Sequence, residues 1–421
     1  MVSLVGTWMQ SVAQAWLVLQ LTHDPFWLGV VAAVQFTPVL VLGLVGGIVA
    51  DVLPKRPTVI ATQTGLMILA LVLATLAWSG AVQVWHILVL AVCLGLINAV
   101  DMPTRQAFVM EIVGREDVAN AVALNSAMFN AARIVGPAIA GLVIGAAGVT
   151  VCFLLNGASF LGVIAGLVAM REEDLHSATR LARPRNAGEI GAHLGEGLRY
   201  VRHTPIVLLA VCLVGFISTL GMNFNVLMPA LASDVLFVGA SGFGFLMSAM
   251  GFGSLVAALV VAAIPRPRLS LLLAGGFALG VFELALGQIR LFPLSLAMAF
   301  LAGAGAIAMT ATANSAIQLA VPDALRGRVM SVYMTVFAGS TPIGGLLAGW
   351  LASSFGPPVA LAVGGGTSAV AAVLAAVWVM RSGRFELPTR LGRRRVAGDD
   401  PAFGLPEDGL AAPGLGPNLR R

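Results

Sequence analysis

The sequence predicts an all-α polytopic membrane protein, in which twelve transmembrane helices form two pseudo-symmetric six-helix bundles. Three observations lead to this prediction: the composition, a series of long apolar segments, and a repeat between the two halves of the chain. Hydrophobic residues make up 58% of the 421 residues and charged residues only 10%, whereas about a quarter of a soluble domain is charged. We therefore expect the chain to lie in a membrane.

Twelve apolar segments follow one another along the chain. Each is long enough to cross a bilayer, since a helix needs about 20 apolar residues to span the hydrocarbon. The segments are residues 2–21, 27–50, 58–78, 85–104, 118–146, 149–170, 205–233, 240–264, 269–288, 292–312, 328–353 and 358–381.

Basic residues are concentrated in alternate connections between these segments. The connections after segments two, four, six, eight and ten, together with the C-terminal tail, hold 22 of the 24 Lys and Arg residues. The exceptions are Arg133, inside segment five, and Arg290, on the opposite side. Because short basic loops stay in the cytoplasm, we expect these connections and both termini there, in a bacterial inner membrane. The basic charge then faces anionic lipid and not nucleic acid.

The two halves of the chain resemble each other. A shift of 208 residues places Phe129, Gly136, Gly141 and Gly148 on Phe337, Gly344, Gly349 and Gly356. This pattern indicates duplication of a six-helix unit. We therefore predict an N-terminal bundle (1–170), a cytoplasmic linker (171–204) with an amphipathic turn near residues 190–200, a C-terminal bundle (205–381) and a disordered tail (382–421) rich in Gly, Pro and Arg.

The sequence lacks the motifs of several other protein classes. Lys55 is the only lysine and follows Pro54, so the chain has no Gly-Lys-Ser/Thr phosphate loop and no conventional ATPase of its own. The histidines and cysteines show no metal-ligand spacing, and no Ser/His/Asp set or Cys/His pair converges in one segment. We expect no enzyme activity, no metal and no cofactor, and a monomer whose partners are lipid and a small molecule.

A twelve-helix chain with a central linker is typical of secondary transporters, whose binding site lies between the halves. Residues 47–56 (GIVADVLPKR) resemble the Gly-x-x-x-Asp-x-x-Gly-Arg-Lys loop of the major facilitator superfamily, with Pro54 at the second glycine. Residues 136–141 (GPAIAG) are similar to the Gly-Pro-x-x-Gly-Gly signature of its proton-coupled exporters. Residues 105–108 (RQAF) and 120–126 (NAVALNS), followed by Arg133, closely resemble the enterobactin-exporter-like branch, also called transmembrane secretion effectors. The resemblance runs over nearly the whole chain and implies the major facilitator fold.

Charges beside segments two, four and eleven are candidates for a cytoplasmic gate. An acid at the end of segment two can accept hydrogen bonds from the backbone amides that begin a helix in the other half, where the helix dipole is positive. The repeat makes the start of segment eleven the natural partner. The alternative is that these charges only anchor helix ends at the interface. The gate candidates are Asp51, Lys55, Arg56, Asp101, Arg105, Glu111, Arg326 and Arg328.

Polar side chains inside the apolar segments are candidates for a substrate cavity. An arginine deep in a membrane costs at least about 2.5 kcal/mol on insertion scales, so we expect Arg133 to face a wet cavity, an anionic substrate or a proton site, unless it makes a structural hydrogen bond between helices. The amides either line the cavity or join helices by hydrogen bonds. The cavity candidates are Gln10, Gln14, Asn98, Asn130, Arg133 and Asn223.

Glu283 in segment nine is the clearest acid inside the hydrocarbon. It is a candidate for proton coupling and for pairing with Arg133, although it belongs to the other half. The alternatives are a lone protonated acid or a side chain that reaches the outer face. Gly136, Pro137 and Gly141 in segment five predict close helix packing where the halves meet, suited to rocking motion.

Together these features predict proton-coupled efflux of a small molecule, either siderophore-like or amphipathic and drug-like, by alternating access. A sodium-coupled or facilitative permease is the alternative within transport. A membrane sensor that transports nothing is a further alternative, and polar residues on several spans argue against it.

Overall fold

The computed structural model describes residues 1–114, 116–171, 173, 187–264 and 268–382. Within these residues, twelve spans are long and apolar enough to cross a membrane, which confirms the predicted number. The first six helices are α1 (Val2–Thr22), α2 (Phe26–Val52), α3 (Lys55–Trp78), α4 (Val84–Val113), α5 (Val118–Ala147) and α6 (Val149–Ala169). The linker helix is α7 (Ala187–His203). The second half contains α8 (Pro205–Gly221), α9 (Phe224–Ala230), the π-helical turn η2 (Leu231–Val235), α10 (Gly239–Ala262), α11 (Leu269–Gln288), α12 (Phe292–Ala320), α13 (Asp323–Phe355) and α14 (Pro357–Ser382).

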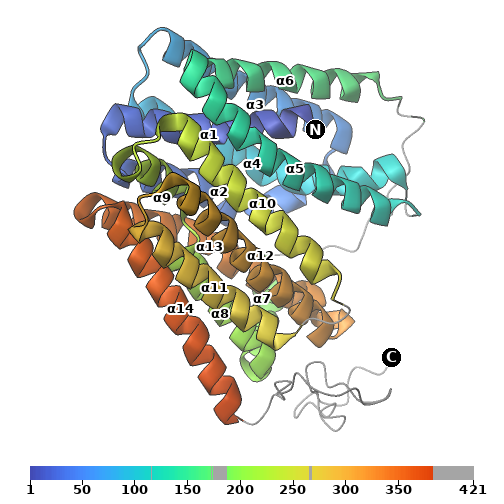
Figure 1. Cartoon of the computed structure of the whole chain (residues 1–421). Coiled ribbons are helices and arrows are strands. Elements are labelled where there is room, and N and C mark those ends of the chain that lie inside the picture. The colour runs from blue at the N-terminus through green and yellow to red at the C-terminus, as the bar shows by residue number, and fades with distance from the viewer. Residues whose placement is uncertain (115, 172, 174–186, 265–267, 383–421) are drawn as a thin grey trace.

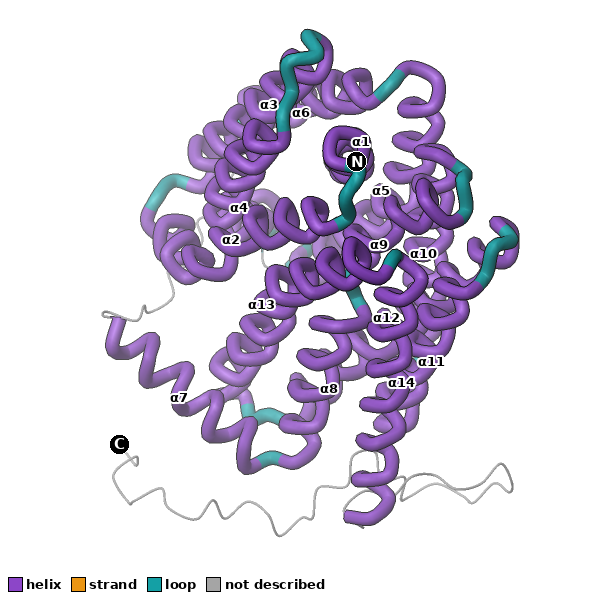
Figure 2. The backbone as a smooth tube through the Cα atoms, turned by 90° about the vertical axis from the view of Figure 1, so that its left-hand side faces the viewer, coloured by secondary structure: helices purple, strands orange, loops and turns teal. Residues whose placement is uncertain are grey.

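The spans pack as two bundles, α1–α6 in the upper part of Figure 1 and α8–α14 in the lower part. In the first bundle α1 packs against α5 and α6, α2 against α4, and α3 against α6. In the second, α12 packs against α10 and α11, and α14 against α11 and α8. The linker helix α7 lies along α13 and α8, outside both bundles (Figure 2).

Segment seven is not one continuous helix. Its first part, α8, ends at Gly221, and α9 begins only at Phe224 after Met222 and Asn223. The segment was predicted as a single span over residues 205–233, so this interruption is a finding of the structure. In membrane transporters, interrupted helices expose backbone polar groups where they line a cavity or bind an ion.

Three spans extend at least five residues beyond a predicted end. Helix α4 continues to Val113, α12 to Ala320, and α13 begins at Asp323. All three extensions lie on the side of the basic connections, which we call the basic end; the other side is the opposite end. Hydropathy locates the part of a helix inside the hydrocarbon, whereas the helix itself continues into the polar region.

The two bundles touch mainly through α5 with α10 and through α2 with α13. A Cβ atom on Gly244 of α10 would overlap the carbonyl oxygen of Pro137 in α5, and a Cβ on Gly29 of α2 would overlap that of Gly345 in α13. Ser248 Oγ donates to the carbonyl oxygen of Ile134 at 2.6 Å. The contacts at Gly244 and Gly29 need glycine because the backbones of the paired helices approach too closely for any side chain.

Contacts between the bundles lie away from the basic end. The part of α5 nearest the basic end is open, and Leu124 is 62% exposed and Phe129 45% exposed. The bundles are therefore closed at the opposite end and separate toward the basic end, as their divergence in Figure 1 illustrates.

Candidate functional site

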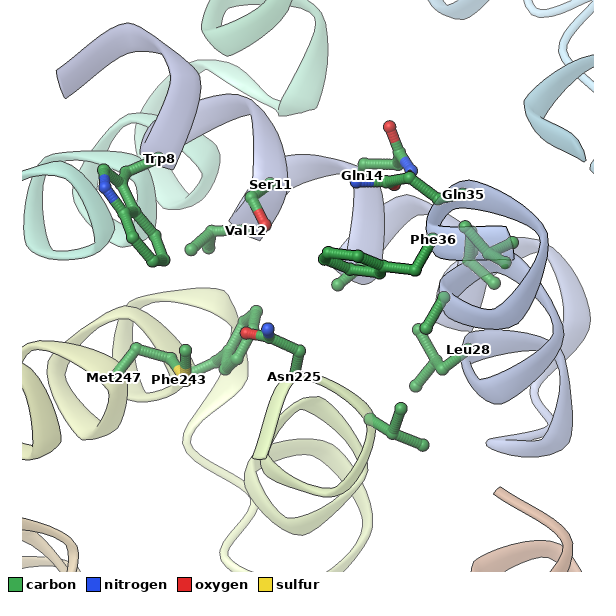
Figure 3. Close-up of a pocket in the computed structure, with 15 residues that line it drawn as sticks. Trp8, Ser11, Val12, Gln14, Leu28, Gln35, Phe36, Asn225, Phe243 and Met247 are labelled. Atoms are coloured by element: carbon green, nitrogen blue, oxygen red, sulfur yellow. The ribbon is translucent and has the colours of Figure 1, made fainter. Parts of the chain in front are cut away.

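A pocket lies between the two bundles and takes its walls from α1, α2, α9 and α10. It holds about 600 Å³ of empty space, counted with the solvent at its mouth. Its polar lining consists of Ser11, Gln14, Gln35 and Asn225, and its larger apolar residues are Trp8, Leu28, Phe36, Phe243 and Met247 (Figure 3). None of the lining residues is ionisable.

Two contacts organise the pocket wall. Gln14 Nε2 on α1 lies 3.5 Å from Oε1 of Gln35 on α2, which leaves further donor and acceptor capacity on both amides. Trp16 stacks on Phe243 of α10 with ring centroids 6.3 Å apart, so an aromatic pair joins the two bundles beside the pocket. A lining of neutral amides and aromatic rings suits an amphipathic molecule with several hydrogen-bonding groups.

Of the predicted cavity amides, only Gln14 lines this pocket. Gln10, one turn away on α1, instead accepts a hydrogen bond from Asn156 Nδ2 of α6 at 2.6 Å. Asn130 donates to the Ser126 carbonyl one turn earlier at 2.8 Å. Asn98 on α4 is not among the residues that line the pocket.

Asn223 is buried at the interruption of segment seven, outside the pocket lining. It precedes α9 as its N-cap, and its Nδ2 donates to the Thr219 carbonyl of α8 at 2.8 Å. The predicted amide therefore joins the two parts of the segment, while Asn225, two residues later, points into the pocket. Sequence reasoning also missed Ser11 and Gln35.

Arg133 lies on the face of α5 that meets α1. Phe129, four residues earlier, packs edge-on against Trp8 with ring centroids 5.7 Å apart, and a Cβ on Gly136, three residues later, would lie 3.0 Å from the Val5 carbonyl oxygen. Residues three and four apart share one helix face, so Arg133 lies on the side of α5 that packs against Trp8, although it is not among the residues that line the pocket. Its Nε and Nη2 atoms are buried and have no hydrogen-bond partner among the described residues.

The helix-packing residues lie at two different contacts. Gly136 faces α1, where its missing side chain leaves room for Trp8, whereas Gly141 lies against Ala240 and Ser241 of α10. Ser241 Oγ donates to the Gly141 carbonyl at 3.0 Å. Pro137 and Gly141 thus lie at the contact between the bundles, and Gly136 holds α1 against α5.

At the basic end, the predicted gate charges form pairs within one bundle or with α7. Lys55 pairs with Glu111 at 3.5 Å and Arg105 with Asp101 at 3.1 Å. Arg56 donates to the carbonyl oxygens of Leu167 and Val168 at the end of α6, at 2.8 and 2.9 Å.

In the second half, Arg326 pairs with Asp323, and Arg328 pairs with Glu196 of α7. Each of these four ion pairs lies within one bundle or joins the second bundle to α7. Asp51 lies in the last turn of α2, and its side chain is outside the described part of the structure. Separated charge clusters agree with an open basic end.

Asp101 is the most buried of these charges, with 1% of its surface exposed. Its Oδ1 accepts hydrogen bonds from Thr62 Oγ1 at 2.6 Å and Gln63 Nε2 at 2.9 Å, both on α3. The carboxylate therefore fixes α4 to α3 near the basic end, and Arg105 supplies the countercharge.

We expect Asp101→Asn to destabilise the protein by roughly 1–3 kcal/mol, because it removes charge-assisted hydrogen bonds and leaves Arg105 without its acid. Asp323, which is 88% exposed and also pairs with an arginine, provides the matched control. Asp323→Asn should leave stability unchanged, since exposed pairs contribute little. Thermal unfolding in detergent measures both. Equal stabilities of the two variants would show that Asp101 is not a structural anchor.

Glu283 neither reaches a surface nor pairs with Arg133. Its side chain is fully buried in α11, 0% exposed, and both carboxyl oxygens lack a partner among the described residues. Each oxygen lies 3.0 Å from the position of a Cβ built on a glycine, Gly221 of α8 for one and Gly364 of α14 for the other. Arg133 belongs to α5 in the other bundle, so the structure does not bring the two charges together.

The chain matches the transmembrane secretion effectors over residues 1–390. Among curated relatives it is 29% identical to the multidrug efflux pump Tap of Mycolicibacterium fortuitum, over 83% of this chain and 87% of that protein. It is 26% identical to the staphyloferrin A transporter of Staphylococcus aureus, over 84% and 87% of the two chains. It is 24% identical to the enterobactin exporter EntS of Shigella boydii, over 86% of each.

Solved structures share the fold. A bacterial homologue of the lysosomal transporter Spinster, in an inward-facing and unoccupied conformation, superposes with a TM-score of 0.68 at 14% identity, over 89% of this chain and 92% of that one. The nucleoside transporter NupG gives a TM-score of 0.66 at 12% identity, over 92% and 100% of the chains.

Proposed function

Because the chain belongs to the transmembrane secretion effectors, a branch of the major facilitator superfamily of membrane transporters, we propose that it exports a small molecule by alternating access, driven by a proton gradient. The observation that supports this most directly is the pocket between the bundles, whose walls come from both halves. A site shared by two rigid bodies changes its access when they rock against each other.

The charge distribution supports an orientation in the membrane, and the exporters among the relatives support outward transport. The bundles separate toward the basic end, and basic connections are retained in the cytoplasm. We therefore assign the basic end and both termini to the cytoplasm, so that substrate enters the pocket from inside the cell. Release would follow once the contacts of α5 with α10 and of α2 with α13 open.

The pocket supports an amphipathic substrate. Aromatic and aliphatic walls would bury its apolar part, and Gln14, Gln35 and Asn225 would bind its neutral polar groups. Arg133 beside Trp8 would bind an acidic group, because its buried nitrogens lack partners. Siderophores and acidic drug-like molecules have this combination, and the relatives include both siderophore and multidrug transporters.

Flux measurements in proteoliposomes test the proposal. We expect a panel that includes a carboxylate siderophore, a catecholate siderophore and an aromatic cationic dye to show uphill movement of at least one acidic member when a pH gradient is imposed. A protonophore should reduce this flux to the passive level. Flux that persists without any ion gradient would identify a facilitative permease, and flux that follows only a sodium gradient a sodium-coupled one. An absence of flux for every class would favour a sensor.

A further inference from the structure

The carboxyl group of Glu283 occupies a small space where three helices meet. A Cβ built on Gly364 of α14 would lie 2.5 Å from the Leu220 carbonyl oxygen and 3.0 Å from Oε1 of Glu283. A Cβ on Gly221 of α8 would overlap Ser368 Oγ and lie 3.0 Å from Oε2 of Glu283. The two glycines thus leave a space that the carboxyl group shares with oxygen atoms of α8 and α14.

The polar atoms that share this space are hydrogen-bond acceptors. The hydroxyl of Ser368 donates its proton to the Gly364 carbonyl at 2.7 Å, so its oxygen is available as an acceptor. The Leu220 carbonyl belongs to the last turn of α8, where the helix ends and carbonyl groups lack their usual amide partners. An ionised carboxylate would therefore face oxygen atoms with no compensating positive charge.

No basic side chain on the packed helices can supply that charge. Helix α11 packs against α8, α12 and α14. The only titratable or charged residues on these four helices besides Glu283 are Cys212 on α8 and Arg381, in the last turn of α14 at the basic end. Arg290 follows α11 and donates to the Gly287 carbonyl at 3.1 Å. A buried carboxylate without a partner is strongly unfavourable, so this conformation requires a cation on the carboxyl group.

The same interruption reaches both the acid and the central pocket. Gly221, beside Glu283, ends α8, and Asn225, four residues later, lines the pocket on α9. Between them, Asn223 ties α9 back to α8 and lies against α13, where a Cβ on Gly344 would be 2.8 Å from its Oδ1. A change in the space around Glu283 therefore acts on the backbone at Gly221, only four residues before Asn225 in the pocket wall.

We propose that Glu283, Ser368 and the carbonyl groups at the end of α8 form the binding site of the coupling cation. The cation is a proton held by the carboxyl group, or a sodium ion held by the carboxylate, the Ser368 hydroxyl and the backbone carbonyls. Either one neutralises the acid and allows α8, α11 and α14 to pack tightly, as they do here. Loss of the cation leaves a charge that drives these helices apart and moves the interruption, and with it Asn225.

This inference rests on the proposed export function, and transport tests it first. Glu283→Gln imitates the neutral acid, so it should abolish gradient-driven uphill export while downhill flux stays within about twofold of wild type, because an isosteric neutral side chain preserves the packing. Glu116→Gln, which changes an exposed acid between α4 and α5, is the matched control and should leave both activities intact. Gradient-driven export by Glu283→Gln at the wild-type rate would overturn the proposal.

Ser368→Ala separates the two cations. If the ion is sodium, loss of the hydroxyl ligand should raise the sodium concentration for half-maximal export several-fold. If it is a proton, export should respond to pH as in the wild type, with no sodium dependence in either protein. Coupling to a proton or to sodium supports the site if it depends on Glu283. Coupling that is unchanged by substitution of both Glu283 and Ser368 contradicts the site.

A second measurement needs no substrate, so failure of the export function can be distinguished from failure of the site. A hydrophobic carbodiimide reacts with carboxyl groups that are protonated in apolar surroundings. We expect wild-type protein to be modified at Glu283 as mapped by mass spectrometry, with modification reduced by high pH or by sodium, and Glu283→Gln to lose the product. If modification at Glu283 depends on neither pH nor sodium concentration, Glu283 is a permanently neutral structural acid, and the proposal is overturned.

Discussion

Arg133→Ala is expected to insert and accumulate as the wild type does and to lose at least about tenfold in transport of an acidic substrate. Two guanidinium nitrogens are buried without a partner, so removing the side chain relieves the cost of holding a charge in the membrane. The same unpartnered nitrogens are the groups that a substrate carboxylate would engage. A charge-assisted hydrogen bond of about 1.5–3 kcal/mol corresponds to roughly ten- to hundredfold in affinity.

The measurement is the substrate concentration for half-maximal flux, compared at equal protein abundance. Arg133→Lys should recover only part of the affinity, because lysine keeps the charge but loses the planar pair of donors. Arg290→Ala serves as control, since Arg290 only caps the carbonyl of Gly287 outside the pocket. If Arg133→Ala transports acidic and neutral substrates as well as the wild type, Arg133 has a structural role alone.

The spans could be predicted from the sequence because membrane crossing depends on local composition. Twelve apolar segments correspond to twelve spans. Of the paired glycines, Gly136, Gly141, Gly344 and Gly349 lie where helices approach closely. The interruption after Gly221 could not be predicted in the same way. Residues 205–233 are apolar enough to give one continuous span despite their two asparagines, and Pro229, which would be expected to break a helix, lies inside α9 instead. At the break Asn223 donates a hydrogen bond back to the Thr219 carbonyl and lies close to Gly344 of α13, and hydropathy detects neither feature.

The site could be predicted only in outline, because it depends on how each helix is rotated about its axis. Gln10 and Gln14 are one turn apart on the same helix, yet Gln10 bonds to Asn156 of α6 and Gln14 lies beside Gln35 on the pocket wall. Gln35 is a single amide in an apolar segment and gave no periodic signal. Glu283 stood out because an acid in a membrane span is costly, but its position beside Gly221 and Gly364 required the three-dimensional packing.

Gly244→Ala is expected to shift the protein toward a conformation that is open at the opposite end. Its new methyl group would overlap the Pro137 carbonyl oxygen across the contact between α10 and α5. These helices belong to different bundles, so the bundles can relieve the overlap by separating without unfolding. Overpacking typically costs 1–3 kcal/mol, and a coupling of that size changes a two-state population ratio about 5–150-fold. Gly29→Ala should act in the same direction through Gly345 of α13.

Cysteine labelling measures this shift. In a background without Cys93, Cys152 and Cys212, a cysteine replacing Ser241 should react faster from the opposite end in Gly244→Ala, while one replacing the exposed Phe129 reacts more slowly from the basic end. Gly253→Ala is the matched control, because its methyl group would overlap the Phe300 carbonyl inside the same bundle and should lower thermal stability without changing access. Gly43→Ala, which meets no atom within 4 Å, should change neither. Labelling of Gly244→Ala and Gly29→Ala at wild-type rates would mean that these glycine contacts do not close the opposite end, and that closure depends on other parts of α2, α5, α10 and α13.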